Sequence, residues 1–186
     1  MRTARPPAGH AADRLWTGAV IVAALGTGYV LKSFYSSATP EQLVWILAPT
    51  VSLLETLTGA GFVFEAYEGF LSTELNLLVA PACAGVNFLI ATFCTGVLGL
   101  VGYTRTPIGR AALLLGCGAI GYVLTVVANC LRLLLALWLA PFGVWASIDP
   151  GTVHRVEGVF VYFTVLCVSF LVARSLLERR LAARLG

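Results

Sequence analysis

The sequence predicts an all-α integral membrane protein with about four transmembrane helices, a re-entrant or interfacial helix and a short extracytoplasmic hairpin-like segment. Of its 186 residues, 59% are hydrophobic and only 11% are charged, whereas about 25% are charged in soluble domains. Four apolar runs approach the roughly 20 residues that a helix needs to cross a bilayer. Most of the basic residues lie beside these runs.

The four apolar runs are expected to cross the membrane in alternating directions. They cover residues 15–31, 85–101, 111–139 and 156–177. Nine of the twelve basic residues lie before the first run, between the second and third, or at the end of the last, and by the positive-inside rule these segments are cytoplasmic. The sequence therefore predicts a multi-pass protein of the cell membrane with both termini in the cytoplasm and no removable signal peptide. The nine are Arg2, Arg5, Arg14, Arg105, Arg110, Arg174, Arg179, Arg180 and Arg184.

Residues 43–57 form a shorter apolar segment that contains Pro49 and Glu55 and has no basic flank. A full span here would place the start of the next run on the wrong side of the membrane. We therefore interpret it as a re-entrant or interfacial helix with both ends outside. The glycine-rich, alternating stretch after it, up to Pro81, is typical of an extracytoplasmic turn or short hairpin.

These elements predict one membrane-embedded domain over residues 15–177, with basic cytoplasmic tails at 1–14 and 178–186. The composition implies membrane lipid as a partner. The basic residues form no stripe with interleaved aromatic residues, which argues against nucleic-acid binding. The five cysteines include no C-x-x-C pair, which argues against zinc and thioredoxin-like sites.

Arg132 is the one charged residue between Ala111 and Ile148. Ionisable residues are costly within a bilayer and usually mark a functional site. Arg132 follows Arg110 by 22 residues, which is about 33 Å along a helix and matches the hydrocarbon thickness. The arginine is therefore expected at the outer face, with Asn129 on the same side of the helix three residues earlier.

Cys83 and His154 are expected at this same outer face. Pro81 marks the start of the helix that Cys83 opens, and His154 lies in the first turn of the last helix, with Glu157 three residues later to hold its ring. Three separate helices thus bring Cys83, Arg132 and His154 to one membrane boundary.

This set of side chains suits nucleophilic catalysis. The thiolate is the reactive form of cysteine, and nearby positive charge favours it. Histidine can take and return a proton, and arginine can stabilise a developing oxyanion. Each residue also has a structural interpretation, in which Cys83 is a small buried hydrophobe, His154 a helix cap and Arg132 an interfacial snorkelling residue.

The ordered motifs at these residues resemble the exosortase/archaeosortase family of membrane-embedded cysteine transpeptidases. The short chain and the letters CAGVNF are most similar to the compact exosortase K type, although Ala84 stands where many relatives carry serine. The motifs are Cys83-Ala84-Gly85 at a helix start, Asn129-Cys130-Leu131-Arg132 after a basic loop, and His154 opening the last helix.

The resemblance implies a sortase-like thiol protease or transpeptidase for protein sorting in the cell envelope. Its substrate would be an exported protein that ends in a short motif, a transmembrane helix and a basic tail. Cys83 would attack a carbonyl near the motif, and an amine acceptor or water would take the acyl product. His154 would be the general acid/base and Arg132 the electrostatic stabiliser, with no metal or organic cofactor. Supporting positions would be Asn129, Glu157 and Gly85.

Two other classes stay open from the sequence. A small membrane transporter or channel subunit would line a polar path with Arg132 and Asn129, but its polar residues should then spread through the membrane depth. A non-catalytic membrane assembly protein would need no reactive thiol at Cys83. A metal site from His154, Cys83 and Glu157 is a third and poorer option, because the ligand set is unconvincing.

Overall fold

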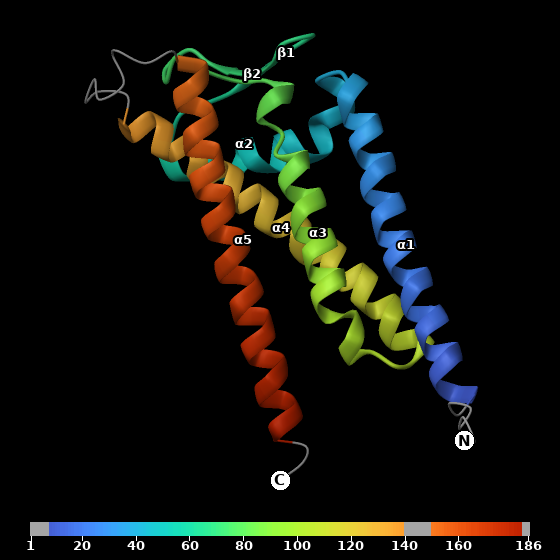
Figure 1. Ribbon diagram of the computed structural model, residues 1–186. Coiled ribbons are helices and arrows are strands. Elements are labelled where there is room, and N and C mark those ends of the chain that lie inside the picture. The colour runs from blue at the N-terminus through green and yellow to red at the C-terminus, as the bar shows by residue number, and fades with distance from the viewer. Residues whose placement is uncertain (1–7, 140–149, 184–186) are drawn as a thin grey trace.

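The computed structural model describes residues 8–139 and 150–183, and within these ranges it contains five helices and a small antiparallel sheet (Figure 1). Four of the described helices are long and apolar enough to cross a membrane, so the chain is a multi-pass membrane protein. The helices are α1 (Ala8–Ser37), α2 (Val44–Thr58), α3 (Val86–Leu100), α4 (Pro107–Leu139) and α5 (Pro150–Ala182), with 3-10 turns η1 (Glu41–Leu43), η2 (Pro81–Cys83) and η3 (Val101–Tyr103).

The four helices that are long and apolar enough to span are α1, α3, α4 and α5, in agreement with the four predicted apolar runs. α1, α4 and α5 are longer than their runs, because helix ends follow backbone signals as well as hydrophobicity, whereas α3 is slightly shorter than the run 85–101. α1 begins at Ala8 and continues to Ser37, three residues before Pro40. α5 continues to Ala182, so both basic tails are partly helical where the structure describes them.

The segment predicted as a re-entrant or interfacial helix forms α2, which lies across the long helices near the sheet (Figure 1). It packs mainly on α4 and buries one face in the core. Pro49 lacks the N–H that would bond to the carbonyl of Trp45 within the helix. The hydroxyl of Tyr122 on α4 donates to that carbonyl at 2.6 Å, so a neighbouring helix supplies the missing donor.

The predicted hairpin-like segment is a three-stranded antiparallel sheet in the order β1-β2-β3. The third strand was not predicted, because its sequence, Leu-Leu-Val, is indistinguishable from the apolar start of the next helix. β3 leads directly into η2, and so the sheet sets where the Cys83 turn begins. The strands are β1 (Val63–Glu65), β2 (Gly69–Ser72) and β3 (Leu77–Val79).

Two glutamates attach the sheet to the helices beneath it. Oε1 of Glu55 on α2 accepts the main-chain N–H of Phe62 at 2.9 Å, and Oε1 of Glu41 accepts that of Tyr67 at 3.1 Å. Hydrogen bonds from Thr39, from the main chain of Glu41 itself and from Tyr67 lower the pKa of the Glu41 carboxyl. Glu55 is partly buried, and its bond to Phe62 fixes the entry to β1.

α3 occupies the centre of the bundle and contacts α1, α4 and α5. Two buried clusters follow it, one around α2 and the Cys83 turn and one between Ala24, Val97 and Val101. Small residues allow close approach between the helices, since a side chain on Gly28 would meet the sulfur of Cys94 at 3.3 Å. The sulfur of Cys94 is therefore part of the packing between α1 and α3.

The two ends of the bundle differ in charge. The start of α1, the α3–α4 connection and the end of α5 lie together, opposite the sheet (Figure 1). Four exposed arginines belong to this end, whereas residues 41–79 at the sheet end carry five glutamates and no basic residue. The four arginines are Arg14, Arg105, Arg174 and Arg179.

Arg110 fixes the position of α4 at the end opposite the sheet. The residue is only 4% exposed. It forms an ion pair with the carboxylate of Asp13 on α1 and donates to the hydroxyl of Thr17 at 3.1 Å. Burying a cation is unfavourable without such partners, so this contact sets the depth of α4 relative to α1.

Asp13→Ala is expected to lower the free energy of unfolding by about 1–3 kcal/mol, because it leaves the buried Arg110 without its carboxylate. Glu178→Ala is the matched control, since it breaks the Arg174–Glu178 pair, whose side chains are 59% and 53% exposed. That loss should stay below about 0.5 kcal/mol. Thermal unfolding of the purified protein in detergent measures both. Equal losses in the two variants would contradict the role given to Arg110.

Candidate functional site

Cys83 ends a short turn between the sheet and α3. Its N–H donates to the carbonyl of Ala80 at 2.8 Å, and the N–H of Ala84 donates to the carbonyl of Pro81 at 3.0 Å. Gly85 then adopts φ 71°, a left-handed conformation that favours glycine, and turns the chain into α3. The side chain of Cys83 is held in this turn with only 7% of the residue exposed.

Asn129 on α4 contacts the Cys83 turn directly. Its side-chain Nδ2 donates to the main-chain carbonyl of Cys83, and its Oδ1 accepts the hydroxyl of Tyr162 on α5 at 2.9 Å. Both polar ends of the fully buried amide are therefore used. The chain of hydrogen bonds joins α5, α4 and the Cys83 turn.

α1 contacts the same turn from the other side. The hydroxyl of Tyr35 donates to the carbonyl of Pro81 at 3.2 Å. The ammonium of Lys32, one turn earlier, lies 5.4 Å from the centre of the Tyr35 ring and donates to Oδ1 of Asn87 at 2.8 Å. Asn87, which had no role in the sequence interpretation, thus fixes a cation near the start of α3.

Arg132 lies one helical turn after Asn129 and is 5% exposed. Its guanidinium carbon lies 5.6 Å from the centre of the Tyr162 ring, an arrangement typical of cation–π contacts. A side chain on Gly158 would meet Nη1 and Cδ of Arg132 at 3.4 and 3.5 Å, so the arginine lies directly against the backbone of α5. Glu157 is also buried, and its charge interacts with that of Arg132.

His154 belongs to α5, but its side chain lies outside the described residues. Its backbone position is four residues before Gly158 and eight before Tyr162. Helical periodicity places these three positions on one face of α5. That face is the one that Arg132 contacts at Gly158.

The structure brings together Cys83, Gly85, Asn129 and Arg132, with Glu157 close to Arg132. It adds residues that sequence reasoning missed. The two tyrosines and Asn87 lie in apolar segments, where nothing in the sequence distinguishes them from packing residues, and Lys32 is typical of an interfacial anchor of the first span. One signal was present in the sequence, because His154, Gly158 and Tyr162 repeat at intervals of four. The added residues are Lys32, Tyr35, Asn87 and Tyr162.

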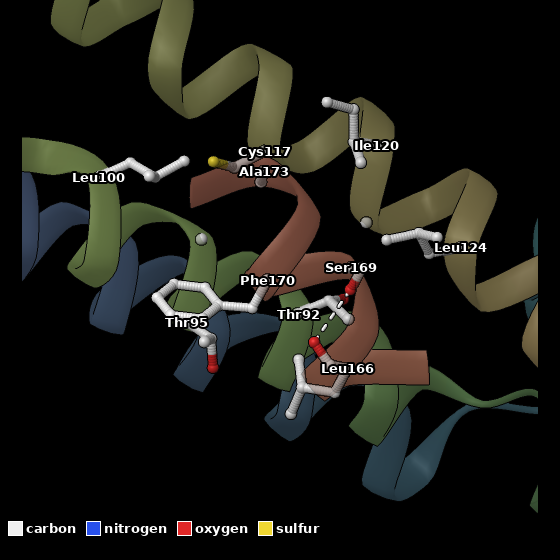
Figure 2. Close-up of a pocket in the computed structure, with 12 residues that line it drawn as sticks. Thr92, Thr95, Leu100, Cys117, Ile120, Leu124, Leu166, Ser169, Phe170 and Ala173 are labelled. Atoms are coloured by element: carbon white, nitrogen blue, oxygen red, sulfur yellow. Dashed lines mark hydrogen bonds between the residues drawn. The ribbon is translucent and has the colours of Figure 1, made fainter. Parts of the chain in front are cut away.

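A separate cavity of about 80 Å³ lies between α3, α4 and α5, further from the sheet (Figure 2). Its lining is apolar or small, including Gly96, Cys117 and Phe170. The hydroxyl of Ser169 donates to the carbonyl of Leu166 in its own helix, at 3.0 Å. Among the described residues, none that lines this cavity is charged, and the charged and polar groups that could support chemistry lie around Cys83.

Comparisons of this chain with protein-family models, with curated proteins and with solved structures return no match. Function is therefore argued from the site itself. The site joins a thiol-bearing turn, a buried arginine and a doubly hydrogen-bonded amide at the sheet end of the bundle. A thiol can act as a nucleophile, and a buried cation can stabilise negative charge that develops nearby.

Gly85→Ala is expected to lower the free energy of unfolding by more than the cost of placing alanine in a left-handed backbone conformation. A Cβ atom there would meet Cγ2 of Thr125 at 3.0 Å and the hydroxyl of Tyr162 at 3.3 Å. Gly59→Ala is the matched control, because Gly59 has φ 74° and no atom within 4 Å of that position. Both variants carry the backbone cost of about 1 kcal/mol. Thermal unfolding should show an additional loss of about 1–3 kcal/mol for Gly85→Ala alone; equal losses would contradict it.

Proposed function

We propose that this protein is a membrane-embedded cysteine peptidase or transpeptidase that removes a C-terminal sorting signal from exported proteins. The convergence of Cys83, Asn129 and Arg132 at one end of the bundle is the observation that carries the proposal. The order of the three motifs, which resembles the exosortase/archaeosortase family, supports the same reaction class. The substrate would end in a short motif, a transmembrane helix and a basic tail.

The reaction would proceed through an acyl-enzyme. The sulfur of Cys83 attacks the carbonyl carbon of the scissile peptide, and its proton passes to His154. The C–N bond then breaks, and His154 returns the proton to the departing amine of the tail. An amine acceptor next attacks the thioester and forms a new amide bond, or water attacks and leaves a carboxylate. Either route restores the Cys83 thiol.

Arg132 would stabilise the oxyanion that forms on the attacked carbonyl. A guanidinium buried in a low-dielectric site is effective in this role, because water does not screen it and it need not reorganise during the reaction. Its position against Gly158 and the Tyr162 ring keeps it near the Cys83 turn. Asn129 and Gly85 would hold the turn, and Glu157 would act on Arg132 and on the His154 helix.

The charge distribution supports an outward-facing site. The exposed arginines at the end opposite the sheet favour the cytoplasm under the positive-inside rule. The acidic sheet end, with the Cys83 turn, would then face the extracytoplasmic side. Both termini would lie in the cytoplasm, on the side where the basic tail of a substrate would also remain.

A transporter or channel subunit fits the structure less well than an enzyme does. Between the Arg110 pair and the Cys83 site, the buried polar residues that the structure describes include Thr92 and Thr125. Both hydroxyls donate to carbonyls of their own helices, at 2.8 and 2.7 Å. Such hydroxyls do not make a polar path. A non-catalytic assembly protein would tolerate the loss of the Cys83 thiol, so mutation separates it from the enzyme.

Cys83→Ala, Arg132→Ala and His154→Ala are each expected to reduce release of the tail from a co-expressed substrate by at least about 100-fold. The substrate should be an exported protein that is encoded by a neighbouring gene and ends in a motif, an apolar helix and a basic tail. Immunoblotting measures how much of it has lost the tail. Cys94→Ala is the control, because this thiol packs between α1 and α3. Tail release by Cys83→Ala at the normal rate would refute the proposed function.

Thr73→Cys and Thr106→Cys test the proposed orientation, since both positions are exposed and lie at opposite ends of the bundle. A membrane-impermeant maleimide added to intact cells should label Thr73→Cys and spare Thr106→Cys until the membrane is permeabilised. The parent protein without an engineered cysteine provides the background signal. Labelling of Thr106→Cys in intact cells, with protection of Thr73→Cys, would reverse the orientation.

A further inference from the structure

Tyr162 on α5 contacts both α3 and α4 at the site. Its hydroxyl donates to Asn129, its ring stacks on Phe88 of α3 with centroids 4.7 Å apart, and the Arg132 guanidinium lies over the ring at 5.6 Å. We propose that Tyr162 is a positioning residue, which holds the Cys83 main chain and Arg132 in a fixed relative position. Its effect on turnover rests on the proposed function, whereas its effect on the Cys83 turn does not.

The hydroxyl of Tyr162 acts on Cys83 through Asn129. An amide side chain can rotate about its last torsion, and the Tyr162 hydroxyl at Oδ1 favours the rotamer that directs Nδ2 toward the Cys83 carbonyl. Without that hydroxyl, Oδ1 of a fully buried amide loses its donor. The loss favours rotation of Asn129 toward another partner and release of the Cys83 carbonyl.

The ring of Tyr162 has a separate role. Phe88 lies in the first turn of α3, only five residues after Cys83, and its ring is nearly parallel to that of Tyr162, at 16°. The ring also contacts Arg132. The ring thus relates the start of α3 to the arginine, and this contact needs the aromatic face rather than the hydroxyl.

Tyr162 packs against two glycines, and one of them, Gly85, leaves the space that its hydroxyl occupies. A Cβ atom at Gly85 would lie 3.3 Å from its hydroxyl, and one at Gly158 would lie 3.9 Å from its ring carbon Cε2. Gly85 comes two residues after the nucleophile, and Gly158 comes one turn before Tyr162 on α5. The glycine of the Cys-x-Gly motif therefore has a spatial reason beyond its own backbone conformation, because it admits this tyrosine.

Tyr162→Phe separates the two roles, since it removes the hydroxyl and keeps the ring. Alkylation of Cys83 by N-ethylmaleimide in the purified full-length protein, quantified for each cysteine by mass spectrometry, should become about tenfold faster as the turn loosens. The rates at the buried Cys130 and at Cys94 should not change. In the tail-release assay kcat should fall about tenfold with KM unchanged.

Tyr122→Phe is the matched control, because it also removes a tyrosine hydroxyl that donates a hydrogen bond, but the acceptor is the main-chain carbonyl of Trp45 rather than Asn129. It should lower thermal stability and leave both Cys83 alkylation and kcat unchanged. A double-mutant cycle adds a second test. In an Asn129→Ala background, Tyr162→Phe should have no further effect on Cys83 alkylation, because its hydroxyl acts through Asn129.

An unchanged alkylation rate at Cys83 in Tyr162→Phe would overturn the positioning role, as would an equal increase at Cys83, Cys94 and Cys130, which would indicate general loosening. The double variant would also overturn the positioning role if its effect on the Cys83 alkylation rate equalled the sum of the effects of Tyr162→Phe and Asn129→Ala. Failure of the proposed function gives a different result. In that case the Cys83→Ala variant still releases the tail of the substrate, while Cys83 in the Tyr162→Phe variant is still alkylated faster than in the parent protein.

Discussion

The hydrogen bond from Asn129 to the carbonyl of Cys83 is the contact on which the arrangement of the site depends. A fully buried amide is stable only when its polar groups have partners, and Asn129 uses Nδ2 for the Cys83 turn and Oδ1 for Tyr162. Rotation of α4 about its axis, or a shift along it, would break both bonds. One side chain therefore relates α4, α5 and the start of α3.

The position of α4 along the membrane normal is set at two points. Arg110 is paired with Asp13 at one end, and Asn129 and Arg132 meet the Cys83 turn and Tyr162 at the other. The two arginines are 22 residues apart on a single helix of 33 residues. Apolar helix faces in lipid slide past one another at low cost, so buried polar contacts supply the registry that hydrophobicity alone does not.

Much of this organisation could be predicted from the sequence, because the bilayer limits the length, hydrophobicity and charge of the segments that cross it. The four spans, the short helix that contains Pro49 and the placement of Arg132 at the sheet end all follow from length, hydrophobicity and the cost of intramembrane charge. The third strand and Tyr162 could not be predicted. Strand β3 is defined by its partner β2, and Tyr162 acquires its role from an amide on another helix.

The division between a polar site and an apolar cavity is consistent with acyl transfer at a membrane surface. A thioester on Cys83 would need an amine or water as acceptor, and both are scarce in the hydrocarbon region. The Cys83 turn lies beside the acidic sheet end, where such an acceptor would arrive, whereas the described residues that line the cavity around Gly96 and Cys117 carry no charge. In the proposed reaction Arg132 would meet the substrate carbonyl at this boundary, and its burial would keep water from screening its charge. At mid-membrane depth the charge of Arg132 would be screened even less, but an amine or water could not reach the thioester. The membrane boundary would allow both strong stabilisation of the oxyanion and access of the acceptor.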